Sequence, residues 1–335
     1  MSIPLILTQE ISPNRLIVID ASDDHDSLRT VVNEISQRLG FQNTVVVKSD
    51  AANLPRQRNI GLQLVQTPVV MFPDDDSMWH PGFASNVLKV YEADVRGQVG
   101  GVSGLGVLTP PPELKQPAYK KSRLRSAKTS LQGYRNHIEK HSFPNPLGLI
   151  GAATWTDKVD VVDDISSRRL PHITGFRMTF RTEAVRRVGF DETLGYGAGY
   201  AYHEDMDVSL RIEKEGYALV SAENAKVCHF EFPGRRGKGY DYGFCAIANC
   251  AYVCRKTMDG DARIFRIMER YLKYKLSLYA RFYSAHGREV FRGAFDAWRS
   301  RFRLLNADQA GLSDAYKDLC DQYIKKSNRP RQAEG

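Results

Sequence analysis

The chain has 335 residues, 42% of them hydrophobic and 26% charged, which is the composition of an ordinary globular protein rather than a disordered or fibrous one. The formal net charge of +8 favours anionic partners, such as phosphorylated substrates, nucleic acid or an acidic membrane surface. No apolar run reaches the roughly 20 residues needed to cross a bilayer, and the five cysteines include no Cys-x-x-Cys pair, so we expect a cytoplasmic protein.

Strands and helices alternate over the first part of the chain. Residues 16–19 are a β-prone run that ends in acidic residues, and residues 27–39 have helical spacing. Residues 44–47 and 69–72 are further strands, with a helix at 56–65 between them. This alternation predicts an α/β fold with a mostly parallel sheet flanked by helices.

Residues 106–170 interrupt that pattern with prolines and a basic stretch, and we interpret them as an irregular insertion beside the active site. Regular structure resumes near residue 172. The strands and helices expected there span 178–181, 182–188, 205–216, 218–221 and 225–230.

The C-terminal part is helical, and residues 263–305 are rich in arginine, lysine and aromatic side chains. Two interpretations are open: a helix on a membrane surface or at a lipid-phosphate acceptor, and a helical layer that packs on the sheet with solvated basic side chains. We expect one main domain over residues 1–255, with two halves at 1–105 and 171–255 on either side of the insertion 106–170. A helical extension at 256–325 and a mobile tail at 326–335 would follow it.

Acidic residues follow two of the expected strands. Asp20 follows the first, and the triplet Asp74, Asp75 and Asp76 follows strand 69–72. Ligands bind beyond the carboxyl ends of strands in open parallel sheets. Adjacent carboxylates repel one another unless a cation or hydrogen-bond donors neutralise them, and Mg²⁺ or Mn²⁺ takes oxygen ligands that it shares with phosphates. The triplet alone predicts either a metal site or a solvated turn.

Six motifs occur in a fixed order along the chain: LPRQRNIG at 54–61, VVMFPDDD at 69–76, PGF at 81–83, GFRMTFR at 175–181, VGFDE at 188–192 and HEDMDVSLR at 203–211. Together they resemble the inverting family 2 glycosyltransferases, which have the GT-A fold. The first three are similar to the nucleotide-binding half of that family and the last three to its acceptor half. The resemblance covers about residues 10 to 255.

The resemblance implies an enzyme that moves a sugar from a nucleoside-diphosphate sugar to a hydroxyl of a glycan or lipid-linked acceptor, in surface polysaccharide synthesis. Asp20 would bind the nucleotide base, and Arg56 or Arg58 would lie near the nucleotide. For Asp20, a turn-forming role is the alternative.

The family's Asp-x-Asp pattern maps onto Asp74 and Asp76, which would hold Mn²⁺ or Mg²⁺ against the diphosphate, with Asp75 open between the metal and the nucleotide. His229 would complete the metal site, and its alternative is a structural histidine. The basic glycine-rich loop that follows would hold the diphosphate through Arg235, Arg236 and Lys238.

Asp205 matches the carboxylate that serves this family as general base, taking a proton from the acceptor hydroxyl as its oxygen attacks the anomeric carbon. Glu204 and Asp207 would support it by orienting the base or the acceptor. Without the resemblance, the pair Glu204 and Asp205 is explained by the preference for acidic residues at a helix N-terminus.

One departure from the family concerns the start of the chain. Members begin with another strand, which forms a wall of the base pocket, and residues 1–10 contain no such strand. We expect either an internal start codon or the loss of that strand.

Two other functions are open. A metal-dependent nucleotidyltransferase would carry a glycine-rich phosphate loop near its N-terminus, and none is evident; a non-catalytic nucleotide-sugar or glycan-binding protein is favoured by the missing strand. Nucleic acid is not an expected partner because no such binding module is recognisable. Peripheral contact with the cytoplasmic membrane face would come from the basic C-terminal helices.

Overall fold

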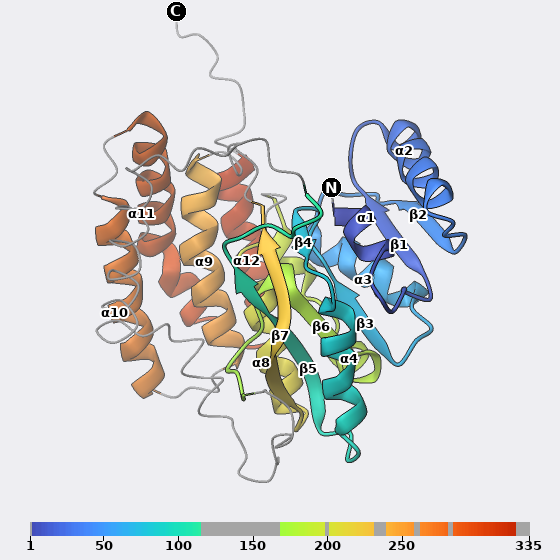
Figure 1. Ribbon diagram of the computed structural model, residues 1–335. Coiled ribbons are helices and arrows are strands. Elements are labelled where there is room, and N and C mark those ends of the chain that lie inside the picture. The colour runs from blue at the N-terminus through green and yellow to red at the C-terminus, as the bar shows by residue number, and fades with distance from the viewer. Residues whose placement is uncertain are drawn as a thin grey trace, which may run out of the picture.

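The computed structural model describes residues 2–114, 168–197, 201–230, 239–257, 262–280 and 284–325. Figure 1 shows a small N-terminal unit, a central sheet with helices, and a layer of C-terminal helices on the side away from the N-terminal unit. Most of the expected insertion, the basic loop 231–238 and the tail 326–335 lie outside the described residues.

The N-terminal unit is a parallel strand pair with three helices: α1 (Ser2–Leu7), β1 (Leu16–Asp20), α2 (His25–Arg38), β2 (Thr44–Lys48) and α3 (Leu54–Leu64). β1 and β2 run parallel, as two strands joined through a helix must. Asp24 caps α2 by accepting from the Ser27 N–H, and Asn53 caps α3 by accepting from the Arg56 N–H. The expected strand–helix–strand–helix order of this unit is confirmed.

The central sheet has five strands: β3 (Val69–Phe72), β4 (Ser77–Trp79), β5 (Val99–Val107), β6 (Met178–Arg181) and β7 (Ala218–His229). Their order is β3-β6-β5-β7-β4, and only β5 and β7 are parallel neighbours. The α/β class is confirmed, but the mostly parallel sheet was wrong, because among the described strands the parallel pairs are β1–β2 and β5–β7 and the other three pairs are antiparallel. Strand order depends on long-range pairing, which the alternation of elements along the chain does not encode.

The two short strands expected at 218–221 and 225–230 form the single strand β7. Its pairing with β5 shifts register between Gly104 and Leu105, whose partners are Ala222 and Lys226. This irregularity accommodates the polar residues that separate the two expected strands, and it brings the C-terminal end of β7 beside β4.

Helices α4 (Phe83–Ala93), α7 (Thr182–Val188) and α8 (Glu204–Lys214), with the short turns η1 (Gly175–Arg177) and η2 (Glu192–Gly195), surround the sheet. Apolar side chains of α4 pack against β5 and β7 in one cluster. A second cluster joins α7 and α8 to Phe180 of β6 and Leu219 of β7. Packing of Val208 and Ile212 in this second cluster therefore holds α8 against the sheet.

The C-terminal layer comprises α9 (Gly239–Thr257), α10 (Ala262–Tyr279), α11 (Ala285–Leu305), α12 (Leu312–Cys320) and a π-helical turn (Asp321–Lys325). α9 lies between α8 and α11. A β-carbon at Gly243 of α9 would lie 1.9 Å from the Val290 carbonyl oxygen, and one at Gly293 of α11 would lie 2.0 Å from the Tyr240 carbonyl oxygen. Glycine is required at both places, because the two helix backbones are in direct contact.

Within the described part of the chain, no helix combines the length and the apolar character needed to span a membrane.

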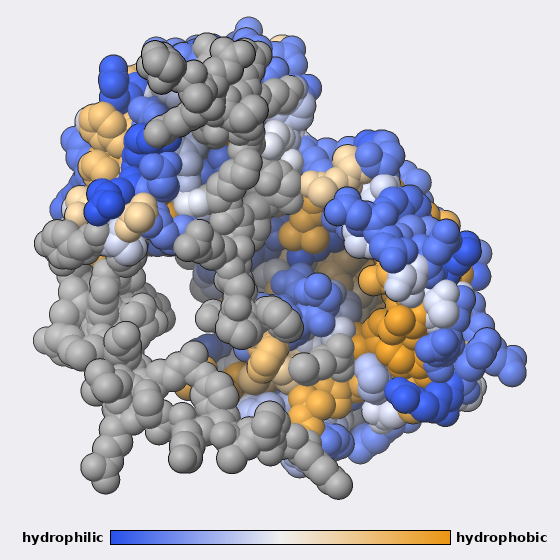
Figure 2. Space-filling view, turned by 90° about the horizontal axis from the view of Figure 1, so that it is seen from above, coloured by the Kyte–Doolittle hydropathy of each residue, from blue (hydrophilic) through white to orange (hydrophobic). Residues whose placement is uncertain are grey.

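The N-terminal unit and the central sheet are separated by an open cleft. Among the described strands, β1 pairs only with β2, and β3 only with β6. A cavity of about 1550 Å³ is lined by Ile17 and Ile19 of β1 and by Val69 and Met71 of β3. Figure 2 shows apolar surface inside the hollow beside the N-terminal unit. As expected, no strand lies within residues 2–10, and α1 occupies part of that segment.

Candidate active site

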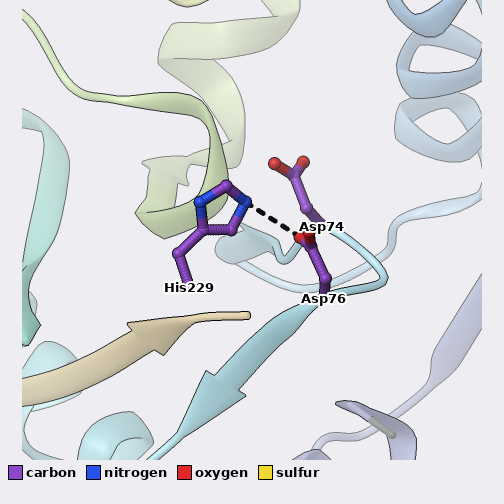
Figure 3. A group of neighbouring side chains, drawn as sticks. All are labelled: Asp74, Asp76 and His229. Atoms are coloured by element: carbon purple, nitrogen blue, oxygen red, sulfur yellow. Dashed lines mark ion pairs between the residues drawn. The ribbon is translucent and has the colours of Figure 1, made fainter. Parts of the chain in front are cut away.

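Asp74, Asp76 and His229 meet at one end of the central sheet. The two aspartates lie in the turn between β3 and β4, and His229 is the last residue of β7, where it pairs with Ser77 of β4. Potential ligand atoms of the three side chains lie within 4.8 Å of one another. Figure 3 shows the two carboxylates and the imidazole turned toward a common space.

Contacts around this cluster hold its side chains in place. His229 Nε2 lies 3.0 Å from Asp76 Oδ1, and the imidazole stacks on the Phe176 ring with centroids 4.7 Å apart. The Ser77 hydroxyl accepts from the Asp74 N–H at 2.9 Å and donates to the Phe176 carbonyl oxygen at 2.8 Å. Two carboxylates and an imidazole, all half-buried, are a donor set that suits a divalent metal ion and leaves positions open for phosphate oxygens.

Arg58 of α3 links this cluster to the acidic start of α8. Its buried guanidinium donates to Glu204 Oε1 at 2.9 Å and to Asp74 Oδ1 at 3.1 Å. The Phe190 ring lies 5.5 Å from the guanidinium carbon. One charged side chain thus positions carboxylates that are 130 residues apart in sequence.

Asp205 occupies the first turn of α8, where its carboxylate is held by two backbone donors. Asp205 Oδ2 accepts from the Gly175 N–H at 3.0 Å, and Asp205 Oδ1 accepts from the Met206 N–H at 2.8 Å. The preceding His203 has a left-handed backbone, with φ of 68°, which turns the chain into the helix. These two bonds fix the orientation of the carboxylate, and Asp205 also lines the large cavity.

Residues 5–138 match the family model described as Glycosyl transferase family 2. The chain carries a family 2 glycosyltransferase domain. The crystal structure of GalNAc-T7 with UDP, GalNAc and Mn²⁺ superposes with a TM-score of 0.51 at 13% identity, over 94% of this chain and 54% of that chain. That of S. aureus TarS 1-349 in complex with UDP-GlcNAc gives a TM-score of 0.48 at 13% identity, over 97% and 87% of the two chains.

At such low identity, the likeness to solved structures shows the fold alone, which is GT-A, as expected from the motifs. A comparison with curated proteins gave no match.

Asp20 of this family 2 domain is the last residue of β1, and it is not among the described residues that line the large cavity. It accepts from the Ser22 N–H at 2.7 Å, and His25 Nδ1 lies 2.8 Å from its Oδ2. Although burial raises the pKa of Asp20, hydrogen bonds from Ser22 and His25 outweigh burial and hold it at about 2. The carboxylate is therefore ionised at neutral pH and fixed by the turn that follows β1.

The other predicted residues divide between the site and its surroundings. Arg58 lies within the site, whereas Arg56 faces Asp50 at 2.5 Å and Glu192 at 3.0 Å. Asp75 is exposed and belongs to the lining of the cavity but not to the three-residue cluster. Arg235 and Arg236 lie outside the described residues.

His172 and Phe176 are site residues to which the sequence analysis gave no role. Both line the large cavity together with Asp205. Within the described residues, His172 Nδ1 has no hydrogen-bond partner, and burial lowers the pKa of His172 although the Asp205 charge opposes that shift. The available sequence signal was that Phe176 belongs to the GFRMTFR motif and that His172 lies just before it.

Glu204 gives the site a pH-dependent contribution to stability. Burial, reinforced by the Asp205 charge, raises the pKa of Glu204 from 4.5 to about 7 despite the bond from Arg58. The folded protein thus retains a proton that the unfolded chain loses, so this stabilisation is complete below about pH 4 and is lost as pH rises through about 7.

We expect Glu204→Gln to remove this dependence, which is on the order of 1–3 kcal/mol in the free energy of unfolding between about pH 5 and 8. Urea denaturation across that range measures it. The matched control is Glu215→Gln, which changes an exposed carboxyl just after the same helix and should keep the wild-type slope. An unchanged slope in Glu204→Gln would contradict the prediction.

Proposed function

We propose that the chain is an inverting, metal-dependent glycosyltransferase that moves a sugar from a nucleoside diphosphate to a hydroxyl of a glycan or lipid-linked acceptor, in surface polysaccharide synthesis. The observation that carries this proposal is a shared cavity, lined by Asp74, Asp76 and His229 and also by Glu204 and Asp205. One group suits a metal–diphosphate, and the other supplies a carboxylate for proton transfer.

On the donor side, Asp74, Asp76 and His229 would hold Mn²⁺ or Mg²⁺. A divalent ion stabilises the charge that develops on a departing diphosphate. Arg58 keeps Asp74 in place through its 3.1 Å bond and adds positive charge beside the site. Asp20 would accept from the nucleotide base, and Arg235 and Arg236 would hold the diphosphate.

On the acceptor side, Asp205 would take the proton from the attacking hydroxyl as the sugar–phosphate bond breaks. Its two backbone bonds hold the carboxylate in a fixed orientation, which a general base needs. Glu204 supports it indirectly, because its bond to Arg58 ties the start of α8 to the metal cluster. Single displacement at the anomeric carbon inverts its configuration.

A non-catalytic nucleotide-sugar-binding protein is the second candidate. The observation that favours it is the open cleft between β1 and β3, where the described strands leave both facing edges unpaired. This candidate predicts nucleotide binding without turnover. For both candidate functions we propose a cytoplasmic location.

The first experiment titrates the protein with UDP, GDP and dTDP, with and without Mn²⁺. Thermal denaturation at each nucleotide concentration measures the stabilisation. UDP and Mn²⁺ are natural first probes, since both are present in the GalNAc-T7 structure. We expect one nucleotide to stabilise the protein only when metal is present, by about 2.7 kcal/mol at a hundredfold excess over its Kd.

Substitution of the ligands identifies the source of that stabilisation. Asp76→Asn and His229→Gln should each lose its metal-dependent part. Asp75→Asn, which changes the neighbouring exposed carboxylate in the same way, should keep it. Absence of a shift with every nucleotide would contradict both candidate functions.

A further inference from the structure

One face of α11 carries a row of arginines. Arg288, Arg292, Arg299 and Arg303 are exposed, and their spacing of four, seven and four residues places them on one side of the helix. The opposite side is buried against the helical layer, through residues that include Val290, Ala294, Ala297 and Leu304. The arginine row therefore points away from the body of the protein.

A row of aromatic side chains runs beside the arginines. It consists of Phe291, Phe295, Trp298 and Phe302, spaced by four, three and four residues. Neighbouring rings stack with centroids about 6 Å apart, and the Arg299 guanidinium lies 5.8 Å from the Phe295 centroid. Phe302 is 52% exposed, although it is a large apolar residue. Apolar and cationic groups are thus paired along the length of the helix.

The region that contains this face also concentrates charge. Residues 262–305 contain eleven Lys and Arg against three Asp and Glu, so their net charge of +8 equals that of the whole chain. Exposed Arg266, Arg270 and Lys273 add a basic row on the neighbouring α10.

The three acidic residues of this region are engaged locally. Glu269 pairs with the buried Arg301, and Asp296 accepts from the Tyr240 hydroxyl. Glu289 pairs with Arg292 across one helical turn.

We propose that this face of α11 docks the protein on an anionic lipid bilayer, with the helix axis parallel to the membrane plane. A helix of 21 residues presents about 30 Å of such surface. Arginines meet the lipid phosphates and carboxylates, while the exposed Phe302 ring enters the interface and the partly buried Phe291 and Trp298 support it from the helical layer, an arrangement like that of basic amphipathic helices on membranes. The exposed apolar ring favours this partner over a nucleic-acid duplex, whose phosphate backbone would engage the arginines alone.

The surface is independent of the chemistry proposed for the cleft, so each can fail without the other. Figure 1 shows α10 and α11 on the side of the molecule opposite β1 and β2. Arg292 also packs over Tyr240, 5.1 Å from its ring centroid, at the start of α9. A protein held by α11 would leave its cleft accessible to a soluble donor.

The test is flotation of the full chain with vesicles of phosphatidylcholine, with and without phosphatidylserine. We expect binding only to the anionic vesicles, weakening as salt increases. Arg292→Gln/Arg299→Gln should lower the partition coefficient about 25-fold, since each basic residue near the surface contributes about fivefold. The control Arg29→Gln/Arg38→Gln removes the same charge from exposed positions of α2. It should lower the partition coefficient less than twofold, because α2 lies on the side of the molecule away from α11 and salt screens its charges from the membrane.

Phe302→Ser separates interfacial docking from charge alone, because it leaves the net charge unchanged and should also weaken vesicle binding. All variants should keep the wild-type melting temperature and nucleotide-induced shift, which shows that they are folded. The proposal is overturned if both arginine pairs reduce binding equally. It is also overturned if anionic vesicles are not bound while duplex RNA or DNA is bound through Arg292 and Arg299.

Discussion

Asp205→Asn is expected to reduce sugar transfer by about 10² to 10⁴-fold, the usual contribution of a general base. The amide retains an oxygen that can accept from the Gly175 or Met206 N–H, so the start of α8 should keep its conformation. The amide is not basic enough to take the proton from the acceptor hydroxyl. The loss is measured as the release of nucleoside diphosphate from a donor sugar that carries the nucleotide identified by titration.

Binding measurements make this result specific. The variant should retain nucleotide- and metal-dependent stabilisation, because Asp205 is not part of the Asp74, Asp76 and His229 cluster. The control Glu215→Gln makes the same chemical change at an exposed position after α8 and should retain activity. Full transfer by Asp205→Asn would show that the base is another residue.

Lys256→Met should lower the free energy of unfolding by about 3 kcal/mol, as expected when one partner of a buried ion pair is removed. Lys256 Nζ lies 2.6 Å from Asp191 and 2.8 Å from Asp207, which is fully buried. Asp207 is also bound by Arg211 at 2.6 Å. Without the lysine, the carboxylates of Asp191 and Asp207 lose the cation that they share, and the contact between α8 and α9 weakens.

Lys317→Met is the matched control, because Lys317 forms an exposed 3.4 Å pair with Asp314 and such pairs contribute little, within about 0.5 kcal/mol. Urea denaturation of both variants compares the two effects. Equal losses would mean that the buried network does not anchor α8. The network also bears on the supporting role expected for Asp207, since its carboxylate is engaged with Lys256 and Arg211 rather than exposed to an acceptor.

The sequence contained enough information to predict where the acidic groups of the candidate site lie, because each acidic motif follows a recognisable strand or begins a helix. It could not choose between Arg56 and Arg58. Residues two apart on a helix point in nearly opposite directions, and the choice depends on Glu204, 146 positions beyond Arg58. That contact exists only after long-range pairing has placed α3 beside α8.

Strand β5 of the central sheet was not predicted from the sequence. β5 reads VGGVSGLGV, and its glycines conceal it because glycine is depleted in strands. The structure explains them: β-carbons at Gly100 and Gly104 would lie 2.5 Å from Tyr217 Cβ and 2.4 Å from Phe83 Cε2. Such a requirement comes from the neighbours, so it cannot be recognised in the strand itself.

The glycine contact between α9 and α11 has a mechanical consequence. Side chains normally separate packed helices and can adopt other rotamers, which permits small sliding motions; backbone against backbone at Gly243 and Gly293 leaves no such compliant layer. α9 begins ten residues after His229. The two helices should therefore move as one rigid unit, so that a displacement of α11 is passed on to α9 without being absorbed between them.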